Sequence, residues 1–223
     1  MTPTDNPRHR GATGRVRRWT PLDETVRLEL PPEGLPLGVD GNGAPVTFPL
    51  LVPTHATRVG VVGEVGLARL LALRLLGQAC DLVVVTNRTD DWQRLAASVP
   101  ESPFAVSQQL RRWPLEGTPA PWALIIDMDE PPPTGFSRTP WSTVVHLSPH
   151  VPAGSGWWQS AQLVLTTAAN AREVATLRPR VDVSAAQRMA FDSVLAIEQT
   201  RVRVFQPSLS HHEYSLLTTY PQR

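Results

Sequence analysis

The sequence contains no lysine, because all 21 of its lysine-plus-arginine positions are arginines. This absence excludes the P-loop lysine that neutralises the β- and γ-phosphates of a nucleotide, and it excludes a lysine Schiff base. The composition is typical of a GC-rich genome, in which arginine, alanine, proline and valine codons replace lysine and isoleucine. We therefore expect an actinobacterium-like source and give arginine no special chemical role on composition alone.

Cysteine and long apolar segments are equally scarce. The one cysteine, Cys80, stands just before an apolar run, which predicts a small buried core residue in a reducing cytoplasm. No run of about 18 apolar residues occurs, and the first residues lack the apolar core of a signal peptide. We expect a cytoplasmic protein without a membrane-spanning segment.

Net charge also excludes one class of partner. The formal net charge is +1, so electrostatics do not favour nucleic acid as a partner. The positive excess lies in residues 1–20, which we predict to be a disordered basic segment whose only membrane contact is peripheral. Its arginines are Arg8, Arg10, Arg15, Arg17 and Arg18.

Patterning predicts one α/β domain over residues 21–217, followed by a tail at 218–223. A β-hairpin is expected within 26–50, with a strand over 26–30 and a tight turn at Asp40–Gly43 between two short strands. From residue 57 to 205, Val-rich runs without a polar face alternate with helical patterns. That alternation predicts a Rossmann-like three-layer core with a mostly parallel sheet.

The expected core elements follow the apolar periodicity. Proline around residues 100–121 indicates that the strand at 104–106 lies at an edge. The other predicted strands are 58–63, 81–86, 122–127, 143–147, 161–165 and 201–205, and the predicted helices are 65–78, 90–98, 168–177 and 184–197, the last with Ser184 as its N-cap.

A glycine turn joins the first core strand to its helix, where α/β folds hold phosphates. Gly60, Gly63 and Gly66 are the candidate cofactor residues, but Leu67 and Ala68 stand where a P-loop has lysine and serine or threonine. Val65 stands where a dinucleotide fingerprint needs glycine. Arg88 follows the second core strand, where an arginine receives the 2′-phosphate of NADP. We expect no cofactor, with NADP as the alternative.

Acidic residues follow a third buried strand. Asp127 and Asp129 resemble a Walker B position, at which a carboxylate holds Mg²⁺, and they are weak metal candidates. The alternative is a solvated strand end that binds nothing. We predict no catalytic residue, since no nucleophile and base stand in a recognisable pattern and the histidines have no metal-ligand spacing.

Two adjacent indoles, Trp157 and Trp158, follow a flexible loop at 152–156. Such a pair either anchors a protein partner at the surface or packs against the base of the next strand. The sequence favours neither alternative over the other.

The order of these motifs resembles actinobacterial proteins grouped with the type VII (ESX) secretion component EccE. The resemblance covers about residues 35–217 and lies in the runs 37–46, 57–63, 68–74, 83–88 with Trp92, and 202–210. It implies a cytoplasmic, non-catalytic scaffold whose partners are proteins such as secretion-machine subunits. The chain lacks the family's transmembrane helices, and the resemblance supplies no site residues. An NADP- or nucleotide-binding enzyme, or a degenerate P-loop ATPase, is the alternative function.

Overall fold

A computed structural model describes residues 34–100, 102–109, 121–134, 139–177, 182–190 and 192–218. These residues belong to one unit, Pro32–Arg223. The predicted basic segment 1–20, the predicted strand 26–30 and the tail beyond residue 218 lie outside the described residues.

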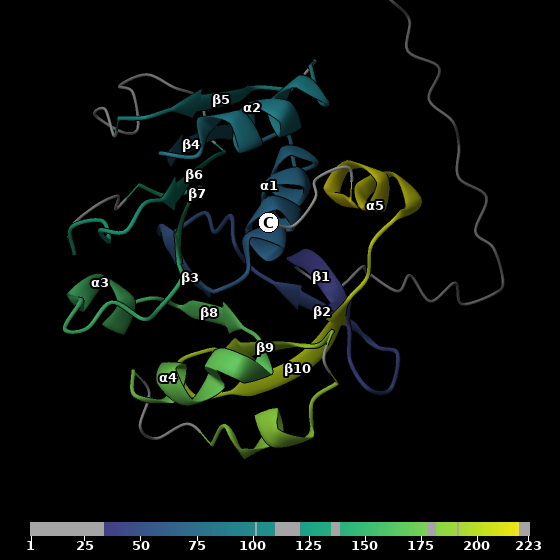
Figure 1. The fold of residues 1–223 in the computed structure, drawn as a ribbon, viewed down its shortest axis with the longest axis vertical. Coiled ribbons are helices and arrows are strands. Elements are labelled where there is room, and N and C mark those ends of the chain that lie inside the picture. The colour runs from purple at the N-terminus through teal and green to yellow at the C-terminus, as the bar shows by residue number, and fades with distance from the viewer. Residues whose placement is uncertain are drawn as a thin grey trace, which may run out of the picture. The chain divides into compact units, whose positions relative to one another are not determined.

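The described strands form one ten-stranded sheet in the order β2-β1-β10-β9-β8-β3-β7-β6-β4-β5 (Figure 1). Its larger part is parallel, as predicted, so each connection between its strands returns the chain to the same edge of the sheet. The parallel strands are β3 (Thr57–Val62), β4 (Asp81–Thr86), β5 (Phe104–Ser107), β6 (Trp122–Asp127), β7 (Ser142–Ser148) and β8 (Leu163–Thr166). β5 pairs only with β4 among the described strands, at the predicted edge.

The remaining strands extend the sheet in antiparallel fashion. They are β9 (Val194–Ile197), β10 (Val202–Pro207), β1 (Leu35–Val39) and β2 (Pro45–Phe48). β1 and β2 form the predicted hairpin, whose turn is held by Asp40: its Oδ1 accepts hydrogen bonds from the backbone amides of Asn42 and Ala44 at 2.8 and 2.9 Å. Gly43 supplies the positive φ of +78° that this turn requires.

Helices cover both faces and give the three predicted layers. On β6, Ala123 and Ile125 pack into a cluster with α1 (Val65–Leu76) and α2 (Thr89–Ala97). Leu124 and Ile126 face the opposite cluster, which contains residues of the short helices α3 (Gly156–Gln159) and α4 (Ala171–Ala175). Because side chains alternate along a strand, β6 needs apolar residues at consecutive positions to serve both layers.

Two predicted helices differ from the structure. The helix expected over 168–177 is divided into the 3₁₀ turn η1 (Ala168–Asn170) and α4. The helix expected over 184–197 is wrong: the 3₁₀ turn η2 ends at Arg188, and Val194–Ile197 form β9 between β8 and β10. All four β9 residues are buried, so tertiary pairing overrides the local helical periodicity.

The chain's last described element is α5 (His211–Thr218), which lies beside α1 in Figure 1. In the part of the chain that the structure describes, no helix has both the length and the apolar character needed to cross a membrane.

Candidate functional site

Parallel strands bring their carboxyl ends to one edge of the sheet, where open α/β folds bind ligands. β3, β4, β6 and β7 pair in register, so Val62, Thr86, Asp127 and Ser148 lie at this edge. Two of the predicted candidates, Asp127 and Arg88, meet here directly. The predicted glycines belong to the neighbouring β3–α1 connection.

The β3–α1 connection consists only of Gly63 and Glu64. Gly63 adopts a φ of +80°, and its amide donates a 2.9 Å hydrogen bond to the carbonyl of Ser148 on β7. A side chain at position 63 would collide with the amide nitrogen of Asn170. The Gly63 amide is thus used within the protein, and the Asn170 side chain occupies the space above the turn. Both are features of a tight structural joint. A phosphate cradle instead aims its amides at the ligand.

The other two candidate glycines have different surroundings. Gly60 lies inside β3 under the ring of Trp158, which would collide with any added Cβ. Gly66 lies in the first turn of α1 with open space around it. The three glycines therefore do not converge on one cavity.

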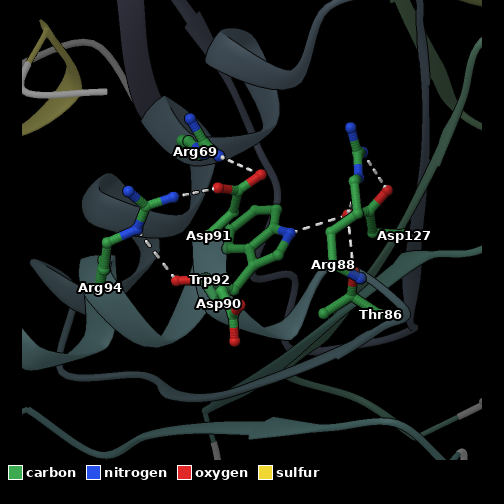
Figure 2. A network of polar contacts seen from close by, with 8 residues as sticks. All are labelled: Arg69, Thr86, Arg88, Asp90, Asp91, Trp92, Arg94 and Asp127. Atoms are coloured by element: carbon green, nitrogen blue, oxygen red, sulfur yellow. Dashed lines mark hydrogen bonds and ion pairs between the residues drawn. The ribbon is translucent and has the colours of Figure 1, made fainter. Parts of the chain in front are cut away.

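Asp127 is the centre of the polar contacts at this edge (Figure 2). Its Oδ2 accepts hydrogen bonds from Thr86 Oγ1 at 2.8 Å, Trp92 Nε1 at 2.8 Å and Arg88 Nε at 3.1 Å. Its Oδ1 accepts a hydrogen bond from Arg88 Nη2. The Asp127 side chain is 6% exposed and that of Arg88 47% exposed. Both oxygens of this carboxylate are thus bonded within the protein.

Local sequence explains how these donors converge. Thr86 ends β4 beside Asp127, and its hydroxyl also accepts the Arg88 amide at 2.9 Å, which shapes the turn into α2. Trp92 is fully buried on α2, where an indole N–H without an acceptor would cost free energy. Sequence patterns alone do not single out Thr86 and Trp92 as partners of Asp127. A tryptophan in the first turns of a helix that follows a polar strand end is the signal that points to them.

A second group of charges connects this centre to α1. Asp91 pairs with Arg69 at 3.6 Å and with Arg94, and the Arg69 guanidinium lies 5.9 Å from the Trp92 ring centroid (Figure 2). These contacts join α1 and α2 on the same side of the sheet. Trp92 therefore lies between the Arg69 guanidinium and the Asp127 carboxylate.

Asp129, the second metal candidate, is exposed and does not share the contacts of Asp127. Among the described residues, no group of three or more histidine, cysteine, aspartate and glutamate side chains is arranged to hold a metal ion. A cation at Asp127 would have to displace the Arg88 guanidinium. This donor set fits an internal ion pair better than it fits Mg²⁺.

Trp157 and Trp158 are both 0% exposed. Trp158 Nε1 donates a 2.8 Å hydrogen bond to His146 Nδ1, so His146 Nε2 carries the proton and donates to the Met128 carbonyl at 3.0 Å. Burial lowers the pKa of His146, which outweighs the opposite effects of the Met128 carbonyl and Asp127. Both indoles are thus buried against the sheet, with Trp158 over Gly60 of β3 and beside His146 of β7.

Cys80 is buried, and burial followed by the charge of Asp81 raises the pKa of its thiol to about 12. A thiol with such a pKa carries almost no thiolate at neutral pH and is a poor nucleophile.

No protein-family model matches the sequence, and no curated protein matches it. The fold is similar to that of VirB4 from Thermoanaerobacter pseudethanolicus, with a TM-score of 0.56 and 9% identity over 82% of this chain and 99% of that one. It is also similar to the cytoplasmic domain of the type VII secretion ATPase EccC from Thermomonospora curvata, with a TM-score of 0.52 and 12% identity over 89% of this chain.

The match covers 32% of the EccC chain, so this chain spans about a third of it. The genome packaging NTPase B204 from Sulfolobus turreted icosahedral virus 2 matches at a TM-score of 0.48 and 11% identity, over 71% of this chain and 99% of that one. Identities this low show a shared fold alone. The chain therefore has a Rossmann-like α/β fold of a kind that a secretion ATPase also has.

Proposed function

We propose that this chain is a non-catalytic α/β module that binds protein partners in a type VII-like secretion system. The observation that carries the proposal is the Asp127 centre: the carboxylate at the strand end where an ATPase holds its metal is bonded by Arg88, Thr86 and Trp92. A Mg²⁺ ion at this carboxylate would have to displace the Arg88 guanidinium, which bonds both of its oxygens.

The glycine turn supports the same proposal. A P-loop surrounds phosphates with free amides and adds a lysine and a hydroxyl. Here Gly63 donates to Ser148, only two residues separate β3 from α1, and the chain has no lysine. Glu64, as the N-cap of α1, also adds negative charge where a phosphate would bind.

One similarity supports a role in secretion: the fold resembles that of the EccC cytoplasmic domain. The EccE-like scaffold role expected from the order of the sequence motifs is part of the proposal. We propose that the module lies on the cytoplasmic side of a secretion machine. The arginines within residues 1–20 provide peripheral attraction to an anionic membrane, each adding about 1 kcal/mol.

Thermal melting with nucleotides tests the non-catalytic part. A ligand at about a hundred times its Kd stabilises a folded protein by about 2.7 kcal/mol, so a nucleotide that binds would raise Tm. Since we propose that neither Mg·ATP nor NADP binds, titration of either against the full chain should leave Tm unchanged. An Arg88→Ala variant is the matched comparison, because it removes the described hydrogen-bond partner of Asp127 Oδ1. A saturable rise in the Tm of the unaltered chain with either nucleotide would overturn the proposal.

Co-purification tests the partner class. We expect the tagged full chain to retain type VII secretion subunits from its native cell extract, in a manner that nucleotide does not affect. Recovery of the chain alone from extracts that contain an intact secretion machine would contradict the secretion role while leaving the absence of nucleotide binding in place.

A further inference from the structure

Helix α5 is attached to the rest of the domain by few contacts. None of its described residues is buried, and Leu217 is the α5 side chain that packs, partly exposed, against the core cluster around α1. A hollow of about 500 Å³ lies along the junction, lined by Leu35, Leu73 and Leu209 among others. Elements with so few buried contacts open at low free-energy cost.

One side chain, Glu213, fixes α5 at its first turn. Its Oε1 accepts a 2.9 Å hydrogen bond from Arg74 Nε on α1, and its Oε2 accepts the Ser210 amide at 2.8 Å. The Glu213 amide donates back to Ser210 Oγ at 3.2 Å, which completes a capping box. The same carboxylate therefore both starts the helix and ties it to α1.

Arg74 contacts two further segments from a nearly buried position. Its side chain is 11% exposed, and besides Glu213 it donates to the carbonyl of Pro36 on β1 and to that of Ser208 after β10. Two of these contacts hold the sheet extension, and the contact with Glu213 holds α5.

We infer that α5 is a latch: it opens as a unit when the Glu213–Arg74 contact is broken, while the sheet and the Arg74 contacts to Pro36 and Ser208 remain. Opening widens access to the apolar surface of α1 at Leu73, which is only partly buried and lines the hollow at the junction. Arg74 is the fixed part of the latch and Glu213 the part that leaves.

Hydrogen exchange of the full chain in its native state tests this inference. Glu213→Gln keeps the side-chain shape and removes the charge, so exchange at the amides of residues 214–218 should rise about ten-fold while β6 amides stay unchanged. His212→Gln, an exposed neighbour on the same helix, is the matched control and should change neither set.

Arg74→Met should differ by also shifting the urea midpoint of the whole domain, because it removes the contacts to Pro36 and Ser208 as well. The latch is refuted if residues 214–218 of the unaltered chain exchange as slowly as β6. It is also refuted if Glu213→Gln leaves their exchange unchanged, or slows or speeds β6 amides to the same extent. The Glu213→Gln measurement decides the question even where Arg74→Met does not fold.

Discussion

Two arginine–carboxylate pairs occupy different places in this domain: one lies at the edge of the central sheet, and the other joins α5 to α1. In Arg88–Asp127 the carboxylate is the buried partner, at the end of a central strand, and the arginine is 47% exposed. In Arg74–Glu213 the side chains are 11% and 18% exposed, and the carboxylate belongs to a peripheral helix. Removing Asp127 damages the fold because Thr86, Trp92 and Arg88 lose their shared acceptor. Removing the Glu213 charge releases only the helix that carries it, because Arg74 keeps its contacts to Pro36 and Ser208.

Asp127→Ala should produce the largest effect. It leaves Trp92 Nε1, Thr86 Oγ1 and Arg88 without their shared acceptor, so the free energy of unfolding should fall by about 3–5 kcal/mol in urea denaturation. Asp129→Ala, two residues further on and exposed, should stay within about 0.5 kcal/mol of the unaltered protein. Equal losses at the two positions would show that the Asp127 centre does not stabilise the sheet edge.

Arg88→Met should cost less than Asp127→Ala. Thr86 and Trp92 still donate to the carboxylate, and the half-exposed guanidinium shares its contacts with water, so we expect a loss of about 1–2 kcal/mol. Arg94→Met removes a surface ion pair with Asp91 on α2, in which the Arg94 side chain is 57% exposed, and should cost no more than about 0.5 kcal/mol. A loss for Arg88→Met as large as that for Asp127→Ala would assign the stability to the ion pair alone.

The contrast between these two pairs also shows what the sequence predicts well. Continuous apolar runs such as residues 122–126 are buried strands because their composition permits no exposed face, and their order gives the parallel sheet. The sequence points to Arg88 and Asp127 separately, since Arg88 follows one strand and Asp127 ends another. That they bind each other depends on β4 and β6 being neighbours, which is a property of the strand order and not of local spacing.

The wrong helix at 184–197 has a related cause. A four-residue apolar run fits a helix face and a central strand equally well, and only the partners of Val194–Ile197 on β8 and β10 decide between them. The terminal element containing Glu213 has the capping-box pattern Ser210-x-x-Glu213, which a local pattern can predict. The hydrogen bond from Arg74 to Glu213 joins residues far apart in the sequence, so no local pattern predicts it.

Acid should destabilise the sheet interior and release α5 in different pH ranges, because His146 titrates in the first and Glu213 in the second. Burial lowers the pKa of His146 from 6.5, so the unfolded chain binds more protons, and this contribution to stability is complete above about pH 6.5 and declines below it. For Glu213, burial acts upward but the Arg74 and Ser210 hydrogen bonds outweigh it and lower the pKa from 4.5. Its contribution is complete above about pH 4.5 and declines as the pH falls further.

Urea midpoints and α5 exchange measured across about pH 8 to pH 4 check both windows. The midpoint of the domain should begin to fall below about pH 6.5, and His146→Gln should remove that slope. Extra opening of α5 should appear only near and below about pH 4.5, since it depends on Glu213. Simultaneous changes in both readouts would indicate that one region controls both.

The smallest expected effect is a gain at the end of α1 that carries Arg74. Ala79 follows this helix with a φ of +54°, a conformation that costs an L-residue about 1–2 kcal/mol and glycine almost nothing. Because glycine also gains freedom in the unfolded chain, Ala79→Gly should raise the unfolding free energy by about 0.5–1 kcal/mol. Gln78→Gly, one position earlier and without a positive φ, should give no gain. The exchange of residues 214–218 should be the same in Ala79→Gly as in the unaltered chain, because the α5 latch opens without unfolding α1; a slower exchange in proportion to the gain would mean that α5 opens only when the whole domain does.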